Sequence, residues 1–451
     1  MDKGIVDGLW LEANKVRGAM DLSDACRIIV YALFIKYIEM RNGREALSSY
    51  DEKYSASYLA LIYGKIVGPE TVGDYIKAVE KDIMPDVGES IISAEMEKLL
   101  EKAETDHVQK IFSIIAEAGF RETSQLYVAA ASLLDRLSHA YGNADGRIPP
   151  NLSLCRLEGR LLNCQDGMRV YDGFCGYGLS LSEAAGGRGT VFMQDIDRSA
   201  AAISTVMALL KGNRIGAVGC GDSQLNPLPY EKYDRIVCEP PFGRKYDNNY
   251  LSSVPEDNCI YPEISDGGSL ALRHLVAHLG ENGIAVVLVP TGMLFKSGKG
   301  AGVRERLAKE YIDAVLELPS GVVPNTWTAT ALLVIKKNKE DDSIFMLNAK
   351  DFFEKPDKKH LTIDEDSISK IIELYEERGT VEGVSCSVSG KDVEDREYNL
   401  CTSQYVISNL KDTIMLGDTE EYLKKYGQLS GQLAAIDKKL ETVRGRFIGK
   451  A

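Results

Sequence analysis

Apolar residues recur at every third or fourth position through about the first 143 residues of the chain. The segment 25–40, ACRIIVYALFIKYIEM, is apolar on almost all sides, as expected of a helix buried within a bundle. Asp21 or Ser23 is a candidate N-cap for this helix. The same spacing between short polar breaks predicts further helices at 71–81, 90–102, 107–118 and 123–141. We therefore expect a helical domain over residues 1–143.

The pattern changes after a turn-rich segment, GNADG, at 142–146. Short β-branched runs then alternate with helical patterns, which is typical of a doubly wound α/β sheet. Connections long enough to hold a helix predict parallel strands with helices on both faces. The predicted strands are 169–172, 190–195, 233–238, 284–290, 312–318 and 330–336, and the predicted helices lie near 179–186, 199–211, 268–280 and 301–309. We expect this domain to cover residues 147–340.

The last part of the chain has a different pattern of charged and apolar residues. Residues 341–415 are charged and mixed, and we expect an α/β extension there. Apolar residues from Tyr422 to Phe447 are spaced 4-3-4-3-4-3-4, which predicts a coiled-coil-like amphipathic helix over 418–451. Gly427, Gly431 and Gly445 each cost this helix ~1 kcal/mol relative to Ala, so the helix needs a surface to pack on. That surface is either this protein's own body or a partner subunit.

Composition and charge exclude several classes of protein. The chain has 451 residues, 44% of them hydrophobic, but no apolar run near the ~18 residues of a membrane span and no basic, apolar leader. We therefore expect a cytoplasmic protein without membrane association. Nine cysteines without a C-x-x-C pair predict reduced thiols and no structural metal. With a net charge of −14, any nucleic-acid contact must be a local patch or depend on a partner.

Glycines and acidic residues gather where the predicted strands end, which is where ligands bind in such sheets. The segment 172–178, DGFCGYG, lies between a strand and a helix, so its backbone can approach a ligand at the helix N-terminus. Asp195 ends the next strand, 23 residues after Asp172, where an acidic side chain takes ribose hydroxyls in nucleotide-binding folds; Asp197 is the other candidate. Asp222 follows a further strand, as either an adenine contact or a turn residue.

A diproline segment follows the strand 233–238 and reads Glu239-Pro240-Pro241-Phe242-Gly243. The prolines make a rigid loop without N–H donors and leave its carbonyls available. Glu239 and the Pro240 carbonyl can each accept one N–H of an amino group and hold its nitrogen in line with an electrophilic methyl, while Phe242 stacks on a base. In isolation, the segment also fits the alternative of a proline-terminated strand with a core Phe.

This order of motifs resembles the amino-group DNA methyltransferases that use S-adenosylmethionine. The segment LWLEANKVRGAMDLSDACRIIVYALFIKYIEM at 9–40 is similar to the helical-domain signature of the modification (M) subunit of type I restriction-modification systems. Segments at 286–337 (VVLVPTGMLFKSGKGAGVRERLAKEYIDAVLELPSGVVPNTWTATALLVIKK) and 347–362 (LNAKDFFEKPDKKHLT) are similar to it too. The resemblance extends from residue 9 to about 410.

The resemblance implies a Rossmann-like domain that transfers a methyl group from S-adenosylmethionine to the exocyclic amine of adenine in DNA. It implies a separate specificity (S) subunit as partner, and possible further partners are a second M subunit and nuclease subunits, with the helix 418–451 as a docking element. The residues that it assigns to the methyl donor are Asp172, Gly176, Gly178, Asp195 and Asp222. Those that it assigns to a flipped adenine are Glu239, Pro240, Pro241 and Phe242. Cys238, without a neighbouring Pro-Cys arrangement, is expected to be a buried strand residue.

Three features depart from the family's usual pattern. Glu239 stands where Asn is usual and is one methylene longer. Tyr177 and Leu179 are bulkier than the usual residues of the glycine-rich turn, and RIPP at 147–150 stands where Phe-Tyr-Thr-Pro is usual. These departures leave two alternatives open: a catalytically weakened or silent paralogue that acts as an assembly or donor-binding subunit, and a methylase of another amine such as a protein glutamine or an RNA base.

Overall fold

The computed structural model describes residues 3–16, 18–42, 47–140, 149–229, 232–244, 246–264, 266–324, 326–355 and 361–406. These residues belong to one compact unit, Met1–Val406. The helix and apolar seam predicted over 418–451 and the turn-rich segment predicted at 142–146 lie outside the described residues. None of the described helices has the length and apolar character needed to cross a membrane.

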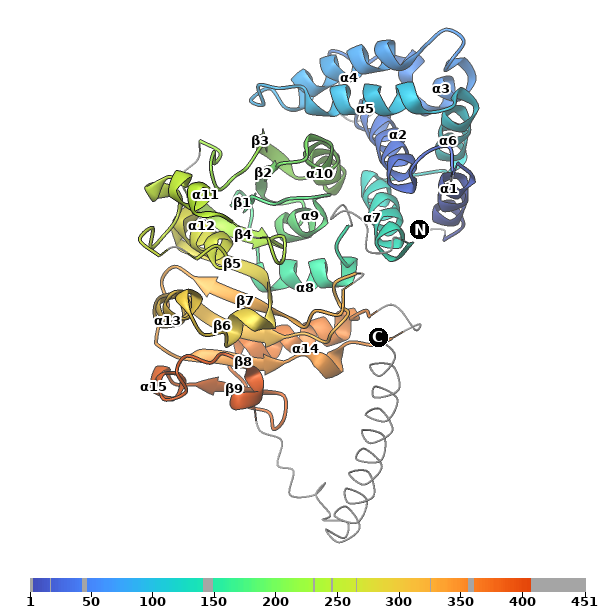
Figure 1. Cartoon of the computed structure of the whole chain (residues 1–451). Helices are drawn as coiled ribbons and strands as arrows, with labels where there is room; N and C mark the ends of the chain where they lie inside the picture. Colours follow the sequence, from blue (N-terminus) through green and yellow to red (C-terminus); the bar gives the residue numbers. More distant parts are fainter. Residues whose placement is uncertain are drawn as a thin grey trace, which may run out of the picture. The chain divides into compact units, whose positions relative to one another are not determined.

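The described N-terminal region is helical, as the spacing of its apolar residues predicts (Figure 1). Its longest helix, α2, is buried along most of its length, and it begins directly after Asp21, whose Oδ1 accepts a hydrogen bond from the Ser23 N–H at 2.8 Å. The helices are α1 (Lys3–Lys15), α2 (Leu22–Asn42), α3 (Ala56–Ile62), α4 (Pro69–Ile83), α5 (Ile91–Lys102), α6 (Thr105–Glu117) and α7 (Thr123–Ala140). The five helices predicted here are confirmed, with ends within a few residues.

The strands that the structure describes form a nine-stranded sheet in the order β3-β2-β1-β4-β5-β7-β6-β8-β9. They are β1 (Arg169–Asp172), β2 (Thr190–Asp195), β3 (Arg214–Cys220), β4 (Tyr233–Cys238), β5 (Leu279–Pro290), β6 (Ile312–Glu317), β7 (Thr330–Lys336), β8 (Ile344–Asn348) and β9 (Ser385–Val388). All six predicted strands are present, and β8 and β9, from the segment whose arrangement the sequence did not predict, extend the same sheet.

The prediction of parallel strands is wrong for β7. β7 lies antiparallel between β5 and β6, and β9 is antiparallel to β8. A parallel strand after β6 would need a crossover connection, usually a helix, to bring the chain back to the edge where β6 begins. The described residues between β6 and β7 contain no helix, and β7 runs in the opposite direction to β6. The parallel half, β3-β2-β1-β4-β5, keeps the strand ends that form the site at one edge.

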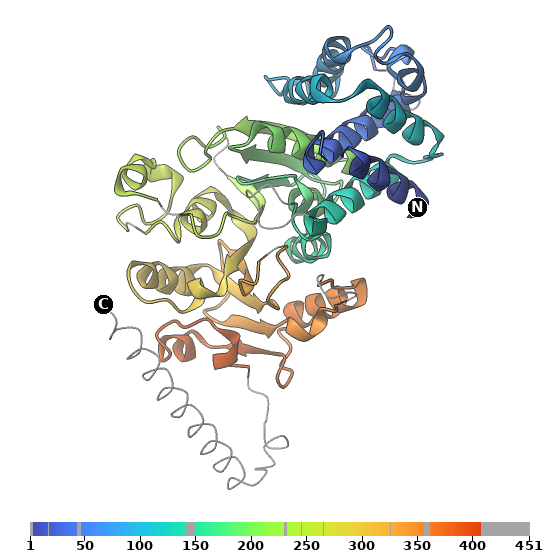
Figure 2. The same ribbon diagram turned by 45° about the vertical axis from the view of Figure 1, so that its right-hand side comes forward.

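Helices cover both faces of this sheet (Figures 1 and 2). One face packs on α8 (Leu152–Leu162) and α14 (Glu365–Glu376), and the other on α12 (Leu270–His278) and α13 (Lys299–Glu310). α9 (Leu179–Ala185) follows β1, and α10 (Arg198–Lys211) packs against β2 and β3 as well as α2, α5 and α7. The remaining α-helices among the described residues are α11 (Asn248–Ser253) and the short α15 (Gly390–Glu394). Thus α10 joins the N-terminal helices to the sheet through a shared apolar core.

Candidate active site

A cavity of about 320 Å³ lies at the carboxyl ends of the parallel strands, and we call it the donor-side cavity. Parallel strands point their carboxyl ends to one edge, so residues far apart in the sequence meet there. Of the nine predicted site residues, this cavity is lined by Asp172, Gly176, Asp195, Asp222, Glu239 and Pro241. Gly178 is not among the lining residues, and Pro240 and Phe242 line a neighbouring cavity.

The glycine-rich turn lies close to α10 because Gly178 has no side chain. Its φ is +75°, and a Cβ built on it would lie 2.3 Å from Ser204 Oγ. Gly176 also has a positive φ of +49°, but a Cβ there would meet nothing within 4 Å. Gly178 therefore serves helix packing, and Gly176 leaves the turn open toward the cavity.

Asp195 holds the glycine-rich turn against the end of β2. Its Oδ2 accepts a hydrogen bond from the Gly176 N–H at 2.8 Å. Asp172 is 2% exposed and its Oδ1 accepts from the Phe174 N–H at 2.9 Å. Burial raises the pKa of both carboxyl groups. The other candidate, Asp197, caps α10 by accepting from the Ser199 N–H at 2.9 Å, so its position favours a structural role.

Asp222 binds the loop and helix that follow the diproline segment. Its Oδ2 accepts a hydrogen bond from the Tyr250 hydroxyl of α11 at 2.8 Å, and Arg244 donates to the same oxygen at 3.4 Å. Its Oδ1 accepts from the Gln224 N–H at 3.0 Å. Asp222 therefore both lines the cavity and orders the α11 region. Sequence reasoning did not identify Arg244, whose only signal was its place two residues after Phe242.

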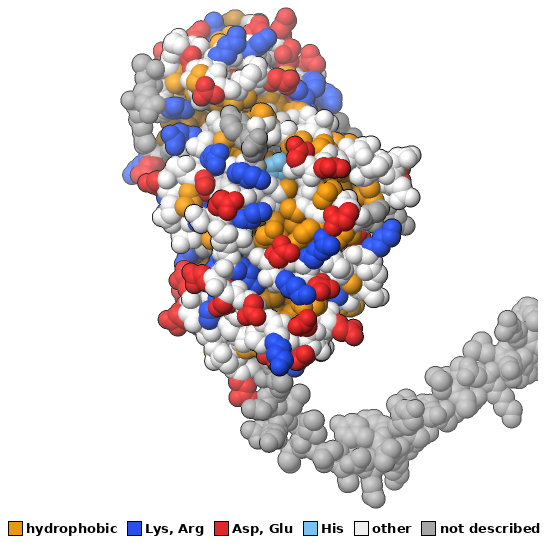
Figure 3. Space-filling model, turned by 90° about the vertical axis from the view of Figure 1, so that its left-hand side faces the viewer, with side chains coloured by type: hydrophobic (Ala, Val, Ile, Leu, Met, Phe, Trp, Pro, Cys, Tyr) orange, Lys and Arg blue, Asp and Glu red, His pale blue; other side chains and the backbone are white. Residues whose placement is uncertain are grey.

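The diproline segment is the wall between two cavities. Pro241 and Arg244 line both the donor-side cavity and a second one of about 320 Å³, which we call the acceptor-side cavity. Pro240 and Phe242 line only the second, together with apolar residues of α12 and α13 and the exposed Lys296 and Lys299. Figure 3 shows the face that carries α11, α12 and α13, where Lys and Arg are interspersed with Asp and Glu around apolar patches.

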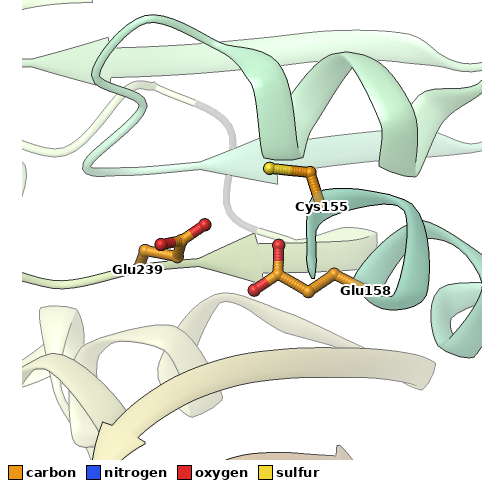
Figure 4. A group of neighbouring side chains, drawn as sticks. All are labelled: Cys155, Glu158 and Glu239. Carbon is orange, nitrogen blue, oxygen red and sulfur yellow. The ribbon is translucent and has the colours of Figure 1, made fainter. Parts of the chain in front are cut away.

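Glu239 turns its side chain toward α8 and α9. Its Oε1 accepts a hydrogen bond from the Ser180 hydroxyl at 2.6 Å. Part of Glu239 is open to the donor-side cavity, but protein surrounds the carboxyl group and raises its pKa to about 7. Figure 4 shows that the side chains of Glu158 and Cys155 point toward it from α8. Cys238, just before Glu239, is fully buried in β4, as predicted.

The two other departures from the usual motifs have defined places in the structure. Tyr177 is 6% exposed, and its hydroxyl lies 2.7 Å from that of Ser23 in α2, so its ring joins the N-terminal core and does not fill the cavity. Leu179 is fully buried in the same core. Pro149 and Pro150 line the donor-side cavity from the segment that stands where Phe-Tyr-Thr-Pro is usual.

Comparisons with known proteins agree with this arrangement. Residues 132–413 match the family described as N-6 DNA methylase. The chain is 26% identical over 304 residues to the methylase subunit of the type I restriction enzyme MjaVII from Methanocaldococcus jannaschii, covering 62% of this chain and 52% of that one. It is 27% identical over 187 residues to the MpnII methylase subunit from Mycoplasma pneumoniae, covering 39% and 34%. The matches thus span about half or less of the length of these curated relatives.

Solved structures share the fold. A type I restriction-modification methyltransferase subunit from Streptococcus thermophilus superposes with a TM-score of 0.69 at 19% identity, over 90% of this chain and all of that one. A modification subunit from Vibrio vulnificus does so with a TM-score of 0.67 at 17% identity, over 86% of this chain and 93% of that one. The family match covers more than half of the sequence and contains every residue of the site. The chain therefore belongs to the N-6 DNA methylase family.

Proposed function

We propose that this protein is the methyltransferase (M) subunit of a type I restriction-modification system and methylates the exocyclic amine of adenine in DNA. The observation that carries this proposal is the diproline wall: Pro241 separates a cavity suited to a nucleoside donor from a cavity suited to a base. A transfer reaction needs its two reactants held close together and in line, and a rigid residue that borders both cavities can position both of them.

The donor-side cavity fits S-adenosylmethionine. When bound, that cofactor supplies an electrophilic methyl group on a cationic sulfur. The acidic residues Asp172, Asp195 and Asp222 line the cavity, where negative charge complements a cation. Gly176 leaves open space where a side chain would stand, at the turn before α9. Asp195 is placed for ribose hydroxyls and Asp222 for the adenine edge of the donor.

The acceptor-side cavity fits a flipped adenine. The amine of a stacked base is out of reach of an in-line attack, so the target must leave the duplex, which costs a few kcal/mol. Phe242 offers a ring for stacking, and the Pro240 carbonyl offers one acceptor for the amine. The exposed Arg244, Lys296 and Lys299 lie around this cavity, where they can contact DNA phosphates.

DNA recognition depends on a separate specificity subunit. The whole chain carries a net charge of −14, and three cations around one cavity give only a local contact with phosphates. We therefore propose a complex with a specificity subunit on DNA, in which a second copy of this chain and nuclease subunits are further partners.

Two measurements test the proposal. Calorimetry with S-adenosylmethionine should show binding to the wild type and loss of binding in Asp195→Ala, while Asp257→Ala, an exposed acid of the same type, binds normally. Transfer of a labelled methyl group to adenine in DNA should then require the specificity subunit. Absence of donor binding in the wild type would overturn the proposal. Donor binding without transfer, with transfer gained in Glu239→Asn, would instead assign the chain to the silent alternative.

A further inference from the structure

Glu158 is a fully buried carboxyl group that the mechanism above does not use. It belongs to α8, and neither of its side-chain oxygens has a hydrogen-bond partner. Glycine allows α8 to approach α9 here, since a Cβ on Gly159 would lie 2.7 Å from the carbonyl oxygen of Glu183. One oxygen each of Glu158 and Glu239 and the sulfur of Cys155 all lie within 4.8 Å of one another (Figure 4).

The groups around Glu158 supply no positive charge. Besides burial, the groups that shift the pKa of Glu158 are Glu239 of the diproline segment, Ser180 of α9 and Asp172 of β1. Cys155 and Cys238, the nearby thiols of α8 and β4, are buried, and burial raises the pKa of both. Arg244, the cation that lines the cavity, donates to Asp222. Two buried carboxyl groups this close cannot both be ionised without a cation.

Ser180 decides which of the two carries the negative charge. Ser180 lies near both carboxyl groups, but it has one hydroxyl proton and donates it to Glu239, which favours the ionised form of Glu239. Glu158 is fully buried, and neither of its oxygens makes a hydrogen bond. Burial, followed by the charge of Glu239, raises the pKa of Glu158 well above its usual value. The remaining proton therefore belongs on Glu158.

We propose that Glu158 is a positioning residue for methyl transfer: it stays a neutral carboxylic acid, donates a hydrogen bond from its O–H group to Glu239, and so fixes the Glu239 carboxylate where it meets the acceptor amine. The gap between the two groups closes by rotation of side-chain torsions, as catalytic hydrogen bonds often tighten when ligands bind. The pair also explains how the longer Glu can serve where Asn is usual, because Ser180 and Glu158 hold it from two sides.

The proposal rests on the proposed function for its last step. The amine nitrogen forms a bond to the methyl carbon, the methyl–sulfur bond breaks with its electron pair going to sulfur, and the nitrogen gives one proton to the Glu239 carboxylate. Glu239 then passes that proton to water at the open side of the cavity, and Glu158 keeps its own proton throughout. Charge and atoms balance without a further reactant.

The neutral state of Glu158 is measurable without turnover. The infrared C=O stretch of a protonated carboxylic acid should be present in the wild type at pH 8, where exposed carboxyl groups are ionised. Burial also raises the pKa of other carboxyl groups, such as Asp172, so the signal of Glu158 is the part of this band that the wild type has and Glu158→Gln lacks. Glu80→Gln, which changes another buried carboxyl group, on α4, should retain that part. A difference spectrum between the wild type and Glu158→Gln without this band would overturn the proposal.

Kinetics with the specificity subunit and DNA separate positioning from simple packing. Glu158→Gln keeps a donor for Glu239 and should retain kcat within about threefold, whereas Glu158→Leu should lower kcat about 10- to 100-fold with little change in the donor KM. An unchanged kcat in the Leu variant would overturn the proposal. Equal losses in both variants, with metal in the purified wild type, would assign the cluster to a cation instead. A wild type that shows the infrared band but transfers no methyl group contradicts the proposed function and not the carboxyl pair.

Discussion

The hydroxyl oxygens of Tyr177 and Ser23 lie 2.7 Å apart and join the glycine-rich turn to helix α2. Tyr177 also lines the donor-side cavity while its ring is buried in the core of the N-terminal helices. The N-terminal region is thus in direct contact with the turn that would hold the methyl donor. Loosening this contact should affect both the stability of the chain and donor binding.

Substitution of Tyr177 tests this contact. Tyr177→Phe removes one buried hydrogen bond and should lower the free energy of unfolding by about 1 kcal/mol. Tyr177→Ala also removes a buried ring and should lower it by about 3–5 kcal/mol, with weaker donor binding. Denaturant unfolding and calorimetry measure the two effects. Tyr58→Phe, on the exposed surface of α3, is the control, and donor affinity unchanged in Tyr177→Ala would refute the link.

The two glycines of the turn should respond differently to Ala. Gly176→Ala should cost about 1–2 kcal/mol for the left-handed backbone alone, because its Cβ meets no neighbour. Gly178→Ala should cost clearly more, because its Cβ also collides with Ser204, whose Cα would lie only 2.7 Å away. Thermal unfolding of the two variants gives the comparison. Equal destabilisation would show that the turn does not pack on α10 as described.

Glu239 should make stability depend on pH. The folded protein keeps a proton on Glu239 up to about pH 7, whereas the unfolded chain keeps it only up to its usual value of 4.5. The free energy of unfolding therefore falls as pH rises from 4.5 to about 7, and the loss is complete above that. Glu239→Gln should be more stable than the wild type at pH 8 by about 1–3 kcal/mol and similar to it near pH 4.5.

Unfolding curves between pH 4.5 and 8 provide the test for Glu239. Glu365→Gln, which changes an acid whose side chain is 61% exposed, should follow the wild type at every pH. If the Glu239→Gln variant and the wild type differ by the same amount at both ends of the range, the carboxyl group of Glu239 is not held in the environment described.

Substitution of Phe242 should weaken the binding of DNA and leave the binding of the methyl donor unchanged. Phe242→Ala removes the ring proposed to stack on the flipped base, worth about 1–3 kcal/mol, or roughly 5- to 150-fold in the KM for DNA. Donor affinity should stay unchanged, because Phe242 lines only the acceptor-side cavity. Steady-state kinetics with labelled donor measure both values, and Leu61→Ala, an exposed apolar residue of α3, is the control. A weaker affinity for the donor alone would contradict the assignment of the two cavities.

Local patterns predicted the elements that position the site. The strands that end at Asp172, Asp195 and Cys238 are β-branched or aromatic runs followed by turn residues, and the structure has them with the predicted bounds. The direction of β7 was predicted wrongly. Whether a strand runs parallel or antiparallel to its neighbours depends on which strands it pairs with, and local periodicity carries no information about that pairing.

Glu158 shows why the rest of the site was missed. No helix was predicted from the sequence over 152–162, and a single glutamate outside a recognised motif gave no reason to single it out. Its spacing was nevertheless informative, since it lies four residues after Leu154 and three before Leu161, both buried on the apolar face of α8. Ser180 carried no comparable signal, and only the packing of α8 on α9 brings it and Glu158 to Glu239.

The most direct test of the account is transfer of a labelled methyl group from S-adenosylmethionine to adenine in DNA, measured with the specificity subunit for the wild type and Glu239→Ala. The account predicts label in N6-methyladenine for the wild type and a loss of about 100-fold or more in Glu239→Ala, with donor affinity retained. A Glu239→Ala variant that transfers the methyl group as fast as the wild type would contradict it.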